Sequence, residues 1–262
     1  MIKENLNKTS SSTKGVRATH IYSNMLDQMR YIHSIEYAKD KKVVDIACGV
    51  GWGTFLLSKT AKEVIGVDLS EIAIDTAKKY YNSHNINYIC NYLQNSEIED
   101  SEIDLITSFE TIEHIEEPKL LINEYHRILK RDGFLLLSTP NGVTFKNSLL
   151  DKPFNPFHVE EYDKESLLRL FDNNWEIVEY RGQYPMSNAE DIKTYRKYIE
   201  HYWIGMKLRN RFGFIGQSLF ILLGKLKIFL VNEPAYQYSC APQIIINDDQ
   251  PAYHFIVLKP KK

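Results

Sequence analysis

Two glutamates and a histidine lie close together in the stretch FETIEHIEEP, residues 109 to 118. Glu110, Glu113 and His114 stand at positions i, i+3 and i+4, so they would share one face if this turn is helical. A second histidine, His158, follows in FNPFHVEEY, within a loop bounded by prolines. Two carboxylates and two imidazoles can hold a divalent ion such as Mg²⁺ and leave positions for a substrate. A histidine among them could instead accept the proton of a substrate hydroxyl.

A glycine-rich turn is the second stretch with chemical potential. In VVDIACGVGWGT, residues 43 to 54, Gly49, Gly51 and Gly53 stand at alternate positions directly behind a predicted strand. Glycines there let the backbone turn tightly and let a ligand approach more closely than any Cβ would permit. The stretch EVIGVDLS ends the next predicted strand at Asp68, where a carboxylate can accept both hydroxyls of a ribose. Together these features predict a nucleoside-containing cofactor.

The residues in and around the glycine turn indicate which kind of cofactor it binds. A dinucleotide site needs the third glycine of GxGxxG, whereas Trp52 and Gly53 occupy this part of the turn. Asp45 lies inside the first strand, and a carboxylate there suits an ammonium or sulfonium better than two phosphates. A dinucleotide oxidoreductase is therefore the least favoured enzyme class.

The elements that must position these residues alternate between short β-branched runs and longer helical stretches, which is typical of βαβ units around a parallel sheet. Strands are expected at residues 42–47, 63–67, 87–91, 103–109, 133–138, 175–181 and 252–258. Helices are expected at 52–60, 70–83, 117–130 and 164–172, with Ser70 and Asp163 as N-caps and Pro118 in a first turn. Because ligands bind at the carboxyl ends of such strands, the glycine turn, Asp68 and FETIEHIEEP should meet at one edge.

The composition is that of an ordinary globular protein. The 262 residues are 44% apolar and 25% charged, with a formal net charge of −2, so no chain-wide signal favours a polyanionic partner. Three widely spaced cysteines, Cys48, Cys90 and Cys240, form neither a CxxC pair nor a disulfide framework, which fits a reducing, cytoplasmic setting. No apolar run is long enough to predict a membrane span.

The expected domain organisation is a mobile N-terminal tail at 1–15, a cofactor-binding domain at 16–184 and 251–262, and an inserted helical cap or substrate subdomain at 185–250. The insert is far too long for a hairpin between the last two strands. Its segment 193–227 carries eight lysines and arginines against one acid, Glu200, interleaved with aromatic residues, and apolar residues continue to 231. A solvated cap, a lid for an anionic acceptor, and a membrane-surface or partner face all fit this segment.

Four stretches resemble, in order and spacing, the motifs of class I S-adenosylmethionine-dependent methyltransferases: VVDIACGVGWGT, VIGVDLS, SEIDLITSFETIEHIEEP and LKRDGFLLLSTPN. Within that class, the chain is most similar to the ubiquinone-biosynthesis O-methyltransferases and to the small-molecule or sugar methyltransferases of antibiotic and surface-polysaccharide pathways. The resemblance covers about residues 25 to 180. It implies a doubly wound, Rossmann-like α/β fold with a seven-stranded sheet whose last strand is antiparallel.

The resemblance also implies which residues hold the methionine and ribose parts of the cofactor. Ala47, Gly49 and Gly51 would line the methionine part, and Asp68 would bind the ribose diol. Ala47 departs from the usual pattern, because it replaces the first glycine of the turn.

Other positions are expected near the two ends of the cofactor. Leu69 would flank the adenine, and the backbone near Tyr92 and Leu93 would meet its edge, although many relatives carry Asp where Tyr92 stands. QMRY, residues 28 to 31, resembles an upstream element whose Arg and Tyr reach the cofactor carboxylate, which suggests Arg30 and Tyr31. A solvated helix face is the alternative interpretation of Arg30.

An ExxEH turn with a later histidine also occurs in small-RNA 3′-end 2′-O-methyltransferases, where the four groups bind a divalent metal, and in the ubiquinone group. Other relatives carry ExxEH without a known metal. The resemblance therefore leaves two possibilities. In one, Glu110, Glu113, His114 and His158 bind an ion; in the other, Glu110 contacts the cofactor, Glu113 pairs with His114, and His114 or His158 is the base.

The predicted function is methyl transfer from S-adenosylmethionine to a hydroxyl of a small metabolite or saccharide. The saccharide could be phosphorylated or nucleotide-linked and belong to a surface-polysaccharide or secondary-metabolite pathway. An RNA 2′-O-methyltransferase is the first alternative, and the net charge of −2 and the lack of an appended RNA-binding motif argue against it. A non-catalytic cofactor-binding module is the second, disfavoured by Glu113, His114 and His158. Peripheral membrane contact stays open.

Overall fold

The computed structural model describes residues 19–147, 152–153, 157–171, 173–183, 243–244, 251 and 253–261. All of them belong to one compact unit made of Met1–Tyr184 and Pro242–Lys262. The predictions for the N-terminal tail, the cap at 185–250 and its basic segment fall outside the described residues, apart from residues 243–244. That domain division stays a prediction.

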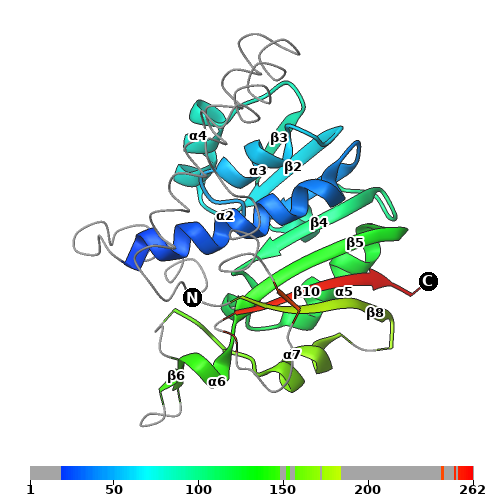
Figure 1. Ribbon diagram of the computed structural model, residues 1–262. Helices are drawn as coiled ribbons and strands as arrows, with labels where there is room; N and C mark the ends of the chain where they lie inside the picture. The colour runs from blue at the N-terminus through cyan, green and yellow to red at the C-terminus, as the bar shows by residue number, and fades with distance from the viewer. Residues whose placement is uncertain are drawn as a thin grey trace, which may run out of the picture. The chain divides into compact units, whose positions relative to one another are not determined.

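Eight strands form one mixed sheet in the order β3-β2-β1-β4-β5-β10-β8-β9 (Figure 1). They are β1 (Lys42–Ile46), β2 (Glu63–Asp68), β3 (Ile86–Cys90), β4 (Ile103–Phe109), β5 (Leu129–Pro140), β8 (Trp175–Gln183), β9 (Gln243–Ile244) and β10 (Tyr253–Pro260). The strands from β3 to β5 run parallel, whereas β10 runs antiparallel to both β5 and β8. The predicted doubly wound sheet with an antiparallel last strand is confirmed, and the two-residue strand β9 extends its seven strands to eight.

Helices cover the sheet and explain why its central strands are almost continuously apolar. The helices are α2 (Thr19–Ala38), α3 (Trp52–Leu57), α4 (Glu71–Tyr80), α5 (Pro118–Ile128), α6 (Gly142–Phe145) and α7 (Lys164–Leu170). Helices α2 and α3 pack together on one face of the sheet, and α5 and α7 pack together over the other (Figure 1). The short strands β6 (Lys146–Asn147) and β7 (Lys152–Pro153) form a separate pair.

Local signals placed several helix ends correctly. The Ser70 hydroxyl accepts the Ala73 amide at 3.3 Å, and Asp163 accepts the Ser166 amide at 2.7 Å, so both predicted N-caps are confirmed. Helix α5 begins at Pro118, as expected for proline in a first turn. Other boundaries differ: β5 begins at residue 129 rather than 133, and the helix that begins at residue 164 ends at 170 rather than 172.

His254 on β10 is a buried histidine that links three elements. Its Nδ1 lies 2.5 Å from the Tyr180 hydroxyl on β8, and its Nε2 lies 3.0 Å from the Tyr162 carbonyl oxygen. Because a carbonyl oxygen only accepts, Nε2 carries the proton and Nδ1 accepts from Tyr180. Burial of the ring lowers the pKa of His254 to about 4.

We expect His254 to make the folded state less stable in acid. Its folded pKa of about 4 lies below the ordinary value of 6.5, so the folded state binds fewer protons than the unfolded chain. The contribution of His254 is complete above about pH 6.5 and is lost as the pH falls toward 4. In urea unfolding, wild type should lose more free energy of unfolding between pH 7 and pH 5 than His254→Gln does. His84→Gln, at an exposed position, is the control, and an unchanged pH dependence in His254→Gln would contradict this assignment.

Candidate active site

The glycine turn connects the carboxyl end of β1 to α3 and adopts left-handed backbone conformations. Ala47, Gly49 and Gly51 have φ values of 54°, 55° and 84°. Among the described residues other than its two chain neighbours, no atom lies within 4 Å of the position that a Cβ on Gly49 would take, so that side of the turn is open. A Cβ on Gly51 would instead lie 2.6 Å from both the Ala77 Cβ and the Tyr88 hydroxyl oxygen. Gly51 is therefore required for packing within the chain, whereas Gly49 leaves room for a ligand.

Asp68 ends β2 beside the glycine turn. Its Oδ2 accepts the Gly49 amide at 2.8 Å, and its Oδ1 accepts the Ser70 amide at 2.8 Å. Each carboxylate oxygen can accept a second hydrogen bond, so the side chain can still bind two vicinal hydroxyls. The fold thus holds Asp68 in place without using up its acceptor capacity.

The residues predicted near the adenine lie beside Asp68. Strands β2 and β3 pair in parallel, with Asp68 opposite Cys90, so Leu69 and Tyr92 follow the ends of neighbouring strands. Leu69 is 40% exposed and Tyr92 is 46% exposed, whereas Leu93 is buried. The structure therefore brings these positions to the same edge as the glycine turn, and their contacts with a cofactor stay predictions.

Asp45 is fully buried within β1 and receives hydrogen bonds from three hydroxyls. Tyr31 of α2 and Thr107 of β4 donate to Oδ1 at 2.9 and 2.8 Å, and Thr54 of α3 donates to Oδ2 at 2.6 Å. Burial raises the pKa of Asp45 to about 6, and the three hydroxyl donors oppose that rise. The Tyr31 ring packs over Gly53, where a Cβ would lie 2.2 Å from it. Asp45 thus fixes α2 against the glycine turn, while the predicted contacts of Asp45 and Tyr31 with the cofactor stay predictions.

Arg30 of α2 is completely buried, so its interpretation as part of a solvated helix face is wrong. Its Nη1 lies 2.7 Å from Asp27 Oδ1 and 3.0 Å from Glu110 Oε1, and its Nε donates to Gln183 at 2.7 Å. The guanidinium also lies 4.7 Å from the centre of the Tyr253 ring. Within the described part of the chain, Nη2 has no hydrogen-bond partner. A buried guanidinium with an unused donor is suited to bind a carboxylate.

Glu110 departs from the predicted metal set. It has a positive φ of 51°, and its Oε1 accepts from Ser138 at 2.9 Å as well as pairing with Arg30. Burial raises the pKa of Glu110, and the neighbouring Arg30 opposes the rise. Glu110 therefore faces Arg30 and lies outside the cluster that the other three predicted ligands form. The reason is local. The chain after β4 makes a 3₁₀ turn at Ile112–His114 and does not continue as one helix from residue 110.

Three of the four predicted ligands, Glu113, His114 and His158, form a cluster. Each offers one ligand atom, and the three atoms all lie within 4.8 Å of one another. The Glu113 carbonyl oxygen accepts the amides of Val159 and Glu160 at 2.7 and 3.2 Å, which ties the loop of His158 to the turn of His114. The loop is thereby held against the carboxyl end of β4.

The side chains of the cluster have defined hydrogen-bonding states. Glu113 Oε2 accepts from Thr139 at 2.9 Å, whereas Oε1 is buried and has no partner in the described part of the chain. His114 Nδ1 lies 3.0 Å from the Phe157 carbonyl oxygen, so Nδ1 carries the proton and Nε2 the lone pair. Burial and the nearby Glu110 raise the pKa of Glu113, while burial and His158 lower that of His114. These surroundings shift Glu113 toward its protonated form and His114 toward its neutral form.

The donor set also limits which ion would fit. With Glu110 excluded, two imidazole nitrogens and one carboxylate oxygen remain. Such a mixed set suits Zn²⁺ or Mn²⁺ better than Mg²⁺, which prefers oxygen ligands. The buried Glu113 Oε1 and the Nε2 lone pair of His114 are compatible with metal binding or with direct binding of an acceptor.

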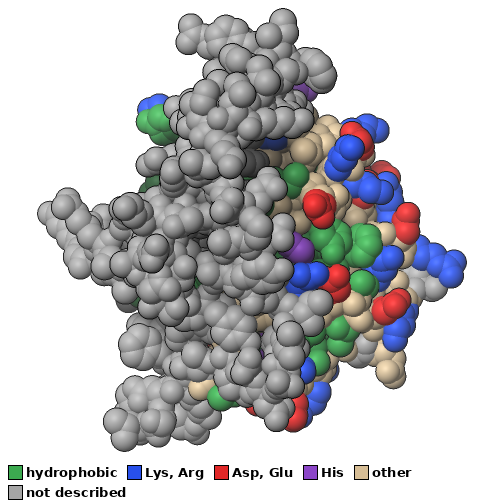
Figure 2. Space-filling view, in the orientation of Figure 1, with side chains coloured by type: hydrophobic (Ala, Val, Ile, Leu, Met, Phe, Trp, Pro, Cys, Tyr) green, Lys and Arg blue, Asp and Glu red, His purple; other side chains and the backbone are tan. Residues whose placement is uncertain are grey.

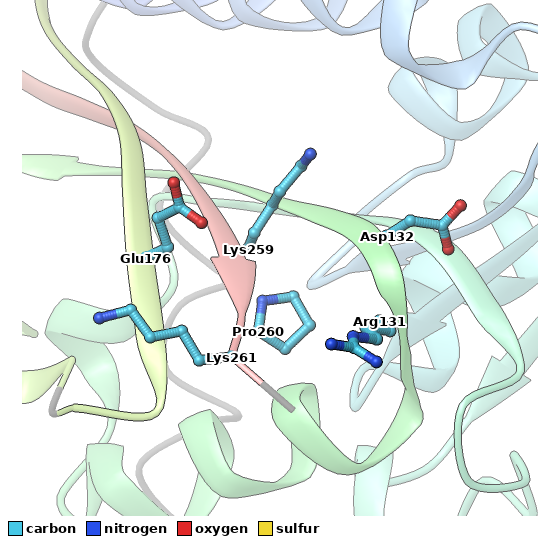
Figure 3. Close-up of a pocket in the computed structure, with 6 residues that line it drawn as sticks. All are labelled: Arg131, Asp132, Glu176, Lys259, Pro260 and Lys261. Carbon is cyan, nitrogen blue, oxygen red and sulfur yellow. The ribbon is translucent and has the colours of Figure 1, made fainter.

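A surface pocket on this unit lies elsewhere and has a different character. It is lined by Arg131, Asp132, Glu176, Lys259, Pro260 and Lys261 (Figure 3). These residues surround the beginnings of β5 and β8 and the end of β10, which is the edge of the sheet opposite the glycine turn. On the face that Figure 2 shows, basic and acidic side chains of described residues are intermixed rather than gathered by sign. The lining of this pocket thus carries charges of both signs.

Two solved structures that share this fold are named as S-adenosylmethionine-dependent methyltransferases. The S-adenosylmethionine-dependent methyltransferase from Mesorhizobium loti has a TM-score of 0.56 and 15% identity, covering 89% of this chain and 99% of its own. A putative one from Listeria monocytogenes has a TM-score of 0.55 and 16% identity, covering 90% of this chain and 99% of its own. At this identity the likeness concerns the fold, which is that of the class I methyltransferases. Among the described helices, none is long and apolar enough to cross a membrane.

Sequence relatives then define the family. The family model for a methyltransferase domain matches residues 44–137. A ubiquinone biosynthesis O-methyltransferase from Coxiella burnetii is 34% identical over 165 residues, covering 55% of this chain and 70% of that protein. A probable S-adenosylmethionine-dependent methyltransferase from Mycobacterium tuberculosis is 32% identical over 130 residues, and the match spans 46% of its length, about half. The chain belongs to the family of S-adenosylmethionine-dependent methyltransferases, as its four motifs indicated.

We expect alanine at Gly51 to reduce stability and alanine at Gly49 to reduce cofactor affinity. Gly51→Ala adds left-handed strain and forces a Cβ against Ala77 and Tyr88, so we expect the free energy of unfolding to fall by about 2–4 kcal/mol. Gly49→Ala adds only the left-handed strain, which should lower the free energy of unfolding by about 1 kcal/mol. Its Cβ would enter the open space beside the turn. Its main effect should be a loss of affinity for S-adenosylmethionine. Urea unfolding and calorimetric titration measure the two quantities, and a larger destabilisation by Gly49→Ala would contradict the packing analysis.

Proposed function

We propose that this chain transfers the methyl group of S-adenosylmethionine to a hydroxyl oxygen of a small-molecule acceptor. The observation that carries the proposal is the cluster of Glu113, His114 and His158 within 4.8 Å, placed after β4. Strand β4 pairs in parallel with β1, whose end forms the glycine turn, so the two features lie at neighbouring strand ends. Attack on a sulfonium methyl needs an aligned acceptor oxygen and a group that takes its proton. The Coxiella burnetii relative, named as an O-methyltransferase, supports oxygen as the methylated atom.

In this proposal the cofactor lies over the glycine turn. Asp68 binds the ribose hydroxyls with the acceptor capacity that its two amide contacts leave. Arg30 binds the cofactor carboxylate through Nη2, which is buried and lacks a partner among the described residues. The other positions proposed to contact the cofactor are Tyr31, Asp45, Ala47, Gly49, Gly51, Leu69, Tyr92, Leu93 and Glu110.

The acceptor hydroxyl lies at the cluster, and His158 takes its proton as the oxygen attacks. The new bond joins that oxygen to the methyl carbon, and the electron pair of the breaking carbon–sulfur bond stays on sulfur. Glu113 and His114 orient the hydroxyl, since Glu113 Oε1 and His114 Nε2 have hydrogen-bonding capacity on this side of their side chains. Positioning together with proton removal accounts for catalysis of such a transfer.

The acceptor class is a small metabolite or saccharide. The basic segment 193–227 supports an anionic acceptor, such as a phosphorylated or nucleotide-linked saccharide. An RNA 2′-O-methyltransferase has less support, because the net charge is −2 and the described charges in Figure 2 are mixed. A non-catalytic cofactor-binding module would leave the hydrogen-bonded cluster without a role.

We expect His158→Asn to separate catalysis from cofactor binding. Loss of a general base lowers the turnover number by about 10²–10⁴-fold, whereas affinity for S-adenosylmethionine should stay at the wild-type value because His158 does not contact the cofactor. Turnover is measured as S-adenosylhomocysteine release with fractionated cell metabolites, together with the mass of one added methyl group on the acceptor. His84→Asn, at an exposed position, is the matched control. Wild-type turnover in His158→Asn would remove the base from this mechanism.

A divalent ion at Glu113, His114 and His158 is a second mechanism, supported by the proximity of their three ligand atoms. When bound, the ion would polarise the acceptor hydroxyl and lower its pKa. The histidine-base mechanism predicts that turnover is unchanged after dialysis against a strong chelator. Loss of turnover that Mn²⁺, Zn²⁺ or Mg²⁺ restores would instead assign the ion to the mechanism, and the ion that restores most would test the preference of the donor set.

A further inference from the structure

A buried carboxylate stands directly behind His158. The Nδ1 of His158 lies 2.7 Å from Glu161 Oε1, and the two side chains are only 10% and 4% exposed. We propose that Glu161 is a positioning residue that holds His158 in the tautomer able to accept the acceptor's proton. This inference rests on the methyl-transfer function proposed above and extends it to a residue outside the motifs.

The tautomer follows from the chemistry of the pair. A carboxylate only accepts hydrogen bonds, so the proton of a neutral His158 ring lies on Nδ1 and the lone pair on Nε2. When Nε2 takes the proton of the acceptor hydroxyl, the ring becomes an imidazolium, and the negative charge of Glu161 stabilises it. The proposed step moves one proton, from the acceptor hydroxyl to Nε2, and none to Glu161.

The His158 ring is placed to serve the cluster. Its centroid lies 4.8 Å from that of His114, with the ring planes at 79°. One of its nitrogens lies within 4.8 Å of the ligand atoms of Glu113 and His114. A rotation of the ring would change which nitrogen meets the acceptor, and the short contact with Glu161 opposes that rotation.

The backbone holds Glu161 in place independently of His158. The Gly142 amide donates to the Tyr162 carbonyl oxygen at 2.8 Å, and residues 141 and 162 form a parallel bridge. A Cβ on Gly142 would lie 2.4 Å from the Glu161 carbonyl oxygen, so glycine at the start of α6 lets the chain that follows β5 contact this segment closely. Tyr162 is 2% exposed and belongs to the main core. Glu161 is therefore carried on a segment that is fixed to the sheet.

Stability does not account for a carboxylate at this position. Glu161 Oε2 is buried and, among the described residues, has no hydrogen-bond partner. A buried carboxylate oxygen without a donor destabilises a fold relative to an apolar side chain of similar size. The neighbouring Glu160 is exposed, so the pair differs in environment although the residue type is the same. Positioning of the His158 ring explains why the buried residue, Glu161, is a carboxylate.

The test uses Glu161→Met, which keeps the length of the side chain and removes the acceptor, with Glu160→Met as the matched control. Nuclear magnetic resonance of protein with ¹⁵N-labelled histidine reports which ring nitrogen of His158 carries the proton. We expect Nδ1–H in wild type and in Glu160→Met, and a population of Nε2–H in Glu161→Met. An Nε2–H tautomer in wild type, or an unchanged Nδ1–H tautomer in Glu161→Met, would overturn the proposal. If Glu161→Met does not fold, the wild-type tautomer still decides.

Turnover supplies the second readout. We expect Glu161→Met to lower the turnover number by about 10- to 100-fold with an unchanged dissociation constant for S-adenosylmethionine. Glu161→Gln, which keeps an acceptor oxygen but not the charge, should recover part of the loss. Wild-type turnover in Glu161→Met would overturn the proposal. If wild type binds the cofactor but methylates no acceptor, the proposed function is contradicted. The tautomer measurement needs no acceptor, so it tests the role of Glu161 separately.

Discussion

One buried carboxylate, Asp45, holds the parts of this site in register. Its two oxygens accept hydrogen bonds from hydroxyls on α2, α3 and β4. The helix before the sheet, the glycine turn and the strand that precedes Glu113 and His114 therefore meet at one side chain. Each of these donors is a neutral hydroxyl, and their hydrogen bonds only partly oppose the rise in the pKa of Asp45 that burial causes. Three hydrogen bonds to one buried group favour a single arrangement of these elements.

The position of α2 determines where Arg30 lies and which carboxylate it pairs with. With Tyr31 bound to Asp45, the preceding residue Arg30 is buried next to the chain that leaves β4 and pairs with Glu110. Glu113 is only three residues further along, yet it groups with His114 and His158 and not with Arg30 and Glu110. Arg30 and Glu110 lie on the side proposed for the cofactor, and Glu113 lies with the two histidines. In the proposed mechanism, the motif would therefore serve both the cofactor side and the acceptor side of the transfer.

Much of the fold could be predicted from the sequence because it depends on local pattern. The β-branched runs, the glycines and the caps at Ser70 and Asp163 all act within a few residues, and the structure confirms them. The grouping of the site residues could not be predicted fully, because it depends on contacts distant in sequence. The spacing of Glu110 and Glu113 fits a shared helix face, but Arg30 and a 3₁₀ turn separate them. The local sequence does not show which of Glu160 and Glu161 is buried. The close contact between Gly142 and the Glu161 backbone, which is distant in sequence, distinguishes the two.

The most direct measurement of the central claim is a crystal structure of the chain with bound S-adenosylhomocysteine. The account predicts ribose hydroxyls hydrogen-bonded to Asp68, the carboxylate of the homocysteine part at Arg30 Nη2, and the sulfur facing Glu113, His114 and His158 across the space where an acceptor would lie. A cofactor bound at another edge of the sheet, or one whose sulfur faces away from these three side chains, would contradict it.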